Sequence, residues 1–118
     1  MIPVDQTLFG VPGGNCFAAC VASILELDIN DVPYFMEDEQ WKPRFNHWIW
    51  RNYLIVPSYF SLTRYGWYPS DIHILHGKSP RGNHCVVARG SKIIHDPHPS
   101  RKGLISIREA TVLHLRER

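Results

Sequence analysis

The sequence has no long hydrophobic run and no strong excess of charge of either sign. None of its apolar stretches approaches the roughly 20 residues that a membrane-spanning helix needs. The N-terminal segment lacks the basic start and apolar run of a signal peptide. The formal net charge is +2, and the basic residues are scattered, which argues against a nucleic-acid partner. We therefore expect a cytoplasmic protein that binds neither a membrane nor nucleic acid.

Cysteines are few, and they lack the tight spacing of a zinc site. The three are Cys16, Cys20 and Cys85, an odd number that suits free thiols in a reducing compartment. Zinc needs three or four converging ligands, usually in closely spaced pairs. Histidines that keep a zinc-stabilised domain open as an alternative are His73, His76, His95 and His98. We expect no metal and no cofactor.

The hydrophobic pattern predicts an α+β fold. Residues 16–27 and 37–52 carry apolar side chains at helical spacing, and Pro43 places the start of the second helix near Lys42. Strand candidates follow at 54–60, 71–75, 84–89 and 92–96. Helices first and strands later indicate a helix packed on an antiparallel sheet. With 118 residues, 44% of them hydrophobic, we expect one domain over 1–118.

A hairpin is predicted around Gly90, but its register stays open. A three-residue loop centred on Gly90 would place His84 opposite Asp96. A two-residue turn, Gly90-Ser91, would instead place Cys85 opposite Asp96. The two registers put different side chains on each face of the sheet.

Cys16 is the candidate nucleophile. It follows Gly13-Gly14-Asn15 and opens an apolar helix, for which Asn15 is the predicted N-cap. The free N–H groups and positive dipole end of a first helical turn favour a thiolate over a thiol. Cys20 and Cys85 lie among apolar neighbours, and we interpret both as small core residues.

Two further residues complete a catalytic set with Cys16. His84 opens one predicted strand and Asp96 closes the next, so the hairpin brings them near each other. His84 would serve as base and acid, and Asp96 would orient its ring. Gln6, ten residues before Cys16, is a candidate donor to an oxyanion, together with the Cys16 amide.

In this order, the residues resemble a papain-like cysteine peptidase in its small, minimal form. They resemble above all the bacterial peptidase domains that remove double-glycine leaders from bacteriocin precursors. That family has a Gln, a Cys at a helix start, a His followed by two valines, and an Asp-Pro. The matching positions here are Gln6, Cys16, His84 with Val86-Val87, and Asp96-Pro97. Segments 14–20, 79–84 and 95–100 also resemble small uncharacterised bacterial and phage proteins.

The residues and the resemblance predict a cysteine hydrolase that acts on a peptide or protein substrate. The same Cys-His-Asp set also serves amide transfer and deamidation, so these reactions stay open. A papain-like scaffold that binds a protein or peptide without turnover is the third possibility. Unequal reactivity of the three thiols would separate an enzyme from a binding module.

Overall fold

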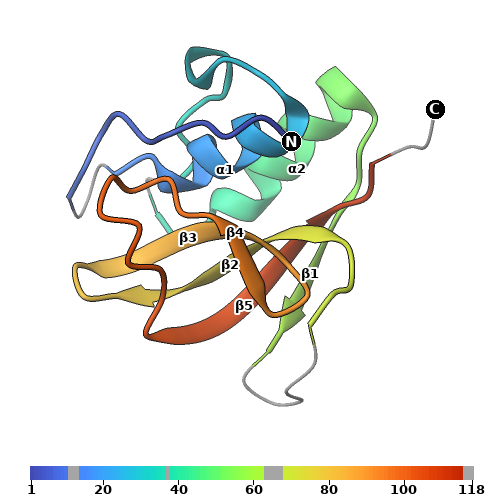
Figure 1. Ribbon diagram of the computed structural model, residues 1–118. Coiled ribbons are helices and arrows are strands. Elements are labelled where there is room, and N and C mark those ends of the chain that lie inside the picture. The colour runs from blue at the N-terminus through green and yellow to red at the C-terminus, as the bar shows by residue number, and fades with distance from the viewer. Residues whose placement is uncertain (11–13, 37, 63–67, 116–118) are drawn as a thin grey trace.

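The chain folds as two α-helices packed on an antiparallel sheet (Figure 1). The computed structural model describes residues 1–10, 14–36, 38–62 and 68–115. In chain order the elements are α1 (Cys16–Leu25), the short 3-10 helix η1 (Ile29–Asp31), α2 (Trp41–Tyr53), β1 (Pro57–Ser61), β2 (Ile72–Ser79), β3 (Gly82–Arg89), β4 (Lys92–His95) and β5 (Ser106–Leu113). The five strands are ordered β1-β5-β2-β3-β4, and each neighbouring pair is antiparallel. The predicted α+β class is confirmed.

The two helices are buried to different extents, as their sequences require. In α1 every residue from 17 to 24 is buried, so this short helix is enclosed on most of its surface. In α2 only Phe45 and Ile49 are buried, which is one amphipathic stripe. Pro43 lies in the first turn of α2, where a missing N–H costs no helical hydrogen bond. Within the described residues, no helix is both long enough and apolar enough to cross a membrane.

The β3–β4 hairpin combines a tight turn with a bulge. Arg89 pairs with Lys92, so the turn has two residues, as in the second of the two predicted registers. The register then shifts at Val87, which faces His95, the last residue of β4. Asp96 therefore lies just beyond β4 and has no cross-strand partner among the described residues. Both predicted registers paired Asp96 with a residue of the neighbouring strand, His84 or Cys85, and neither pair is present in the described sheet.

Two parts of the sheet differ from the sequence-based prediction. The strand predicted at 71–75 extends to Ser79, so β2 and β3 leave only Pro80 and Arg81 between them. This tight connection sets His76 directly opposite Cys85. The strand β5 was not predicted, and it occupies a central place in the sheet. Its first half contains the charged pair Arg108-Glu109 and is partly exposed, whereas Ala110, Thr111 and Leu113 in its second half are buried.

Side chains on the two faces of the sheet belong to two hydrophobic clusters. The larger cluster lies between the helices and the sheet and includes Phe17, Phe45, Ile74 and Val87. The smaller cluster includes Leu75, Val86 and Ala110 and lies on the opposite face. Adjacent residues such as Ile74 and Leu75 enter different clusters because successive strand residues point to opposite faces. Fully burying one such side chain stabilises the fold by about 1.5–3 kcal/mol.

The N-terminal segment is held against the loop that follows β4 (Figure 1). The Gln6 backbone N–H donates to the Pro97 carbonyl at 3.1 Å. The His95 ring nitrogen Nε2 donates to the Val4 carbonyl at 2.9 Å. Arg101 adds an ion pair with Asp5 at 2.6 Å. These contacts place the segment that contains Gln6 beside the loop that contains Asp96.

The glycine at position 77 is required by the close approach of β2 and β5. A Cβ atom there would lie 1.9 Å from the Ser106 carbonyl oxygen, at the register shift between the two strands. We expect Gly77→Ala to lower the free energy of unfolding by about 2–3 kcal/mol, because the strands must move apart. Urea denaturation followed by circular dichroism measures this change.

Gly90→Ala is the matched control for that measurement. Nothing lies within 4 Å of a Cβ at Gly90, so only its positive φ of 57° opposes the substitution. That conformation costs a non-glycine residue about 1 kcal/mol. Equal losses of stability in the two variants would contradict the role assigned to Gly77.

Candidate active site

Cys16 is the first residue of α1, and it is partly exposed at the wall of a cavity. Asn15 occupies the N-cap position, but its side chain makes no capping bond to α1. Its Oδ1 instead accepts the backbone N–H groups of Thr7 and Leu8, both at 2.9 Å. The prediction of Asn15 as the N-cap residue is confirmed, but its side chain does not supply the capping hydrogen bond. Because Asn15 is bound to the N-terminal segment, the positive end of α1 acts on Cys16.

Gly14 allows the chain to close tightly before Cys16. Its N–H donates to the Gly10 carbonyl at 3.1 Å, and a Cβ at Gly14 would lie 2.9 Å from the same oxygen. A side chain at this position would push the loop away from α1. Gly13, the other glycine predicted to shape this loop, lies outside the described residues.

His84 and Asp96 form a short, buried hydrogen bond. The distance from His84 Nε2 to Asp96 Oδ1 is 2.7 Å. Asp96 also accepts the backbone N–H groups of His98 at 2.9 Å and Gly103 at 2.7 Å. Burial raises the pKa of Asp96, but the bonds from these three residues outweigh it and hold the pKa below its ordinary value. Asp96 is thus an ionised, fixed acceptor that orients the His84 ring.

His84 Nε2 is bonded to Asp96, so Nδ1 is the ring nitrogen available for interaction with Cys16. Hydrogen bonding from Cys85 lowers the pKa of Cys16 most, burial opposes it, and His84 lowers it further, to about 5. For His84, burial lowers the pKa, but the interactions with Cys16 and Asp96 outweigh it and raise the pKa above 6.5. Between these two values the site holds a thiolate beside an imidazolium.

Cys16 and His84 both line the cavity, and each shifts the pKa of the other. Among the described residues, the short hydrogen bonds of the site join His84 to Asp96 and Cys85 to His76. A nucleophile and its base are often further apart in a free enzyme than in a complex with substrate. The structure therefore places Cys16, His84 and Asp96 in one region of the molecule, and their catalytic roles stay a prediction.

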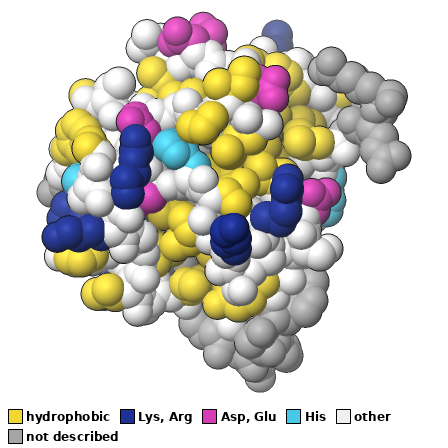
Figure 2. Space-filling model, in the orientation of Figure 1, with side chains coloured by type: hydrophobic (Ala, Val, Ile, Leu, Met, Phe, Trp, Pro, Cys, Tyr) yellow, Lys and Arg dark blue, Asp and Glu magenta, His cyan; other side chains and the backbone are white. Residues whose placement is uncertain are grey.

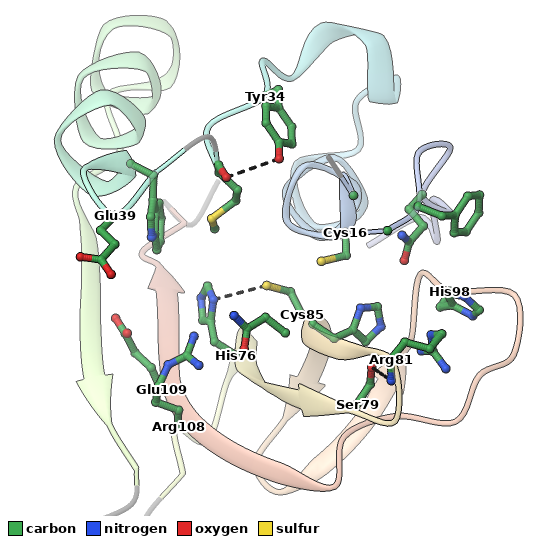
Figure 3. Close-up of a pocket in the computed structure, with 18 of the residues that line it drawn as sticks. Cys16, Tyr34, Glu39, His76, Ser79, Arg81, Cys85, His98, Arg108 and Glu109 are labelled. Carbon is green, nitrogen blue, oxygen red and sulfur yellow. Dashed lines mark hydrogen bonds between the residues drawn. The ribbon is translucent and has the colours of Figure 1, made fainter. Parts of the chain in front are cut away.

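Cys85 and His76 are functional candidates that the sequence reasoning missed. Cys85 is buried in the core, as predicted, yet it also lines the cavity beside Cys16 (Figure 3). Its sulfur lies 3.3 Å from His76 Nδ1, and His76 Nε2 lies 2.7 Å from Thr111 Oγ1. Burial, together with the positive charges of Arg108 and Lys42, lowers the pKa of His76 to about 3. A two-residue turn at Pro80-Arg81 would have been the only signal of this pairing.

Gln6 lies in the wall of the same cavity, where the oxyanion donor was predicted. Its Nε2 donates one hydrogen to the Leu8 carbonyl at 2.9 Å. An amide nitrogen carries two hydrogens, so a second donor is left. The Gln6 Oε1 is buried and has no hydrogen-bond partner among the described residues.

The cavity has a volume of about 840 Å³, within the range of small-molecule and peptide sites. Its apolar lining is contributed by Phe9, Tyr34, Met36 and Trp41. Its charged lining includes Glu39, Lys42, Arg81, Arg108 and Glu109. Figure 2 shows a band of hydrophobic side chains across one face of the molecule, with Lys and Arg side chains beside it. Figure 3 places Cys16 and Cys85 between Glu39, Arg108 and Glu109 on one side and Arg81 and His98 on the other.

A metal centre was the alternative that the histidines left open. In the part of the chain that the structure describes, no three His, Cys, Asp or Glu side chains converge as metal ligands would. Two of the histidines are engaged elsewhere: His95 with the Val4 carbonyl and His73 with the Asp71 carbonyl, at 2.7 Å.

Comparison with known proteins adds no identification. The chain matches no protein family, no curated protein and no solved structure.

The electrostatic role of Asp96 can be measured through the reactivity of Cys16. Asp96→Asn keeps the side-chain shape but removes the charge that raises the pKa of His84. A larger fraction of His84 is then neutral near pH 6, so Cys16 keeps its proton to higher pH. We expect the acidic limb of iodoacetamide alkylation to move up by about one pH unit. Peptide mapping by mass spectrometry follows the alkylation of Cys16.

Asp31→Asn is the control, because this exposed carboxylate belongs to η1 and does not line the cavity. Its alkylation profile should coincide with that of the unmodified protein. A profile unchanged in Asp96→Asn would show that the carboxylate does not support the ion pair.

Proposed function

We propose that the protein is a cysteine hydrolase that cleaves a peptide or isopeptide bond. The observation that carries this proposal is the thiolate-forming Cys16 at the start of α1, beside a His84 ring that Asp96 holds. A partly exposed cysteine with a lowered pKa and a partnered histidine is the usual arrangement of a thiol nucleophile. The similarity of the motif order to papain-like peptidases agrees with the same reaction.

The reaction proceeds in two stages. The Cys16 sulfur attacks the substrate carbonyl carbon and pushes its electron pair onto the oxygen. As the tetrahedral intermediate collapses, His84 Nδ1 gives its proton to the leaving amine, and a thioester remains on Cys16. His84 then takes a proton from water, whose oxygen attacks the thioester and releases the acid. Asp96 stabilises the charged ring whenever His84 carries both protons.

The developing oxyanion needs donors fixed on the same side as the sulfur. The backbone N–H of Cys16 at the first turn of α1 is one, because the first four amide groups of a helix have no helical acceptor. The second Nε2 hydrogen of Gln6 is the other. Each such donor contributes about 2.7–4 kcal/mol to lowering the barrier in hydrolases of this kind.

The cavity suits an extended peptide better than a compact polar metabolite. Aromatic rings occur at both ends of the lining, with Phe9 stacked edge-on against His98 at 5.4 Å and Trp41 beside His76 at 5.7 Å. Between them lies the Cys16–His84 pair, so a chain crossing the cavity passes the sulfur. An amine could receive the acyl group in place of water, which would make the protein an amide transferase. The three free thiols also agree with a reducing, cytoplasmic setting.

The test uses a mixed peptide library, with cleavage read by mass spectrometry. We expect Cys16→Ser and His84→Ala each to reduce cleavage by at least about 1,000-fold, because each removes a group that acts on the reacting atoms. Circular dichroism should be unchanged in both. Iodoacetamide should modify Cys16 far faster than the buried Cys20 and Cys85.

Two control variants accompany this test. Cys20→Ser changes a buried thiol outside the cavity, and His47→Ala changes an exposed ring of α2. Both should keep full cleavage. Full activity in Cys16→Ser would disprove the assignment of the nucleophile. Absence of cleavage with equal, slow alkylation of all three thiols would favour a binding module.

A further inference from the structure

Two of the three cysteines face each other in the proposed active site. Cys16 lies at the start of α1 and Cys85 lies in β3, and these two elements pack directly together. Both side chains line the same cavity, Figure 3 draws their sulfur atoms near each other, and each thiol shifts the pKa of the other. The hydrolytic mechanism uses Cys16 but gives no role to the Cys85 thiol.

Cys85 is held by a second group of polar side chains. His76 Nδ1 contacts its sulfur at 3.3 Å, and Thr111 fixes the other ring nitrogen at 2.7 Å. The His76 ring also packs against the rings of Phe17 and Trp41, at 5.6 and 5.7 Å between centroids. A buried thiol with a fixed polar partner on one side and a second sulfur on the other is unlike an ordinary core cysteine.

We propose that Cys16 and Cys85 form a redox modification site, in which a hydroperoxide oxidises Cys16 and Cys85 converts the product into a reversible intramolecular disulfide. This goes beyond the hydrolase function, since it depends on the thiol pair and not on any carbonyl substrate. It also predicts the consequence for that function: a disulfide-bonded Cys16 has no thiolate to attack with.

The chemistry balances in two steps. The Cys16 thiolate attacks one oxygen of the hydroperoxide, the O–O bond breaks, and an alkoxide or hydroxide leaves; sulfur is oxidised to the sulfenic acid and the peroxide is reduced. The Cys85 sulfur then attacks the Cys16 sulfur, and the thiol proton departs with the sulfenic hydroxyl as water. A dithiol reductant reverses the bond by thiol–disulfide exchange and becomes a disulfide itself.

Access and selectivity follow from the burial of the three thiols. Cys16 is the only partly exposed cysteine of the three, so a peroxide in the cavity meets it first. Cys85 is buried behind it, where it meets the oxidised Cys16 rather than the solvent. Cys20 is one helical turn further along α1, fully buried and outside the cavity lining. The oxidation should therefore yield one disulfide and leave one free thiol.

The test treats the purified full chain with hydrogen peroxide at a small molar excess, and then blocks the free thiols with N-ethylmaleimide in guanidinium chloride, which exposes the buried Cys20. We expect the intact mass to show loss of two hydrogens and a single maleimide adduct. Peptide mapping without reduction should join the peptides that contain Cys16 and Cys85, and dithiothreitol should restore three free thiols. Cys20→Ser is the matched control, and it should form the same bond.

Cys85→Ser removes the second sulfur while keeping a small polar side chain, and Cys85→Ala serves if the serine variant folds poorly. In either variant Cys16 should gain one oxygen that dimedone traps, and then pass to the irreversible sulfinic acid. If unmodified protein reaches the sulfinic acid as fast as these variants and forms no disulfide, the redox pair is disproved. Because every readout is a mass, the result is independent of whether a peptide substrate is cleaved.

Discussion

The buried carboxylate of Asp96 is the group on which the rest of the site depends. It accepts hydrogen bonds from the His84 ring and from two backbone N–H groups of the loop that follows β4. One carboxylate thus fixes both the catalytic ring and the loop itself. That loop in turn binds the N-terminal segment through the Pro97 carbonyl and Arg101. Loss of the Asp96 charge would therefore affect the histidine, the loop and the segment leading to Cys16 together.

The sequence predicts most of the helices and strands, and it also singles out Cys16, His84 and Asp96. Both predictions rest on local patterns of residue type. Apolar periodicity places α1 and α2 to within a few residues, and valines and isoleucines mark β3 and β4. The positions of Cys16, His84 and Asp96 follow from a helix start and a hairpin. Their approach depends on the hairpin lying under the start of α1, which no local pattern specifies.

The rest could not be predicted, for reasons that are also physical. β5 begins with a partly exposed stretch that contains Ser106, Arg108 and Glu109, and such a stretch resembles a polar loop. Asn15 has the right residue type for a cap, but the N-terminal segment competes for its side chain and wins two hydrogen bonds. The partnership of Cys85 with His76 depends on the register of β2 and β3, which the two-residue connection at Pro80-Arg81 sets. Long-range pairing of this kind is invisible to local periodicity.

The order of the strands in the sheet also determines when the site can form during folding. β5 is the latest of the five strands in the chain, yet it lies between β1 and β2. Until it is made, β1 has no neighbour in the sheet, and the wall that supplies Thr111, Arg108 and Glu109 is missing. During synthesis Cys16 is made long before β5. The cavity around Cys16 is therefore incomplete until β5 has been added. High contact order of this sort makes folding slow, and here the cavity around Cys16 is complete only after β5 has been made and has paired with β1 and β2.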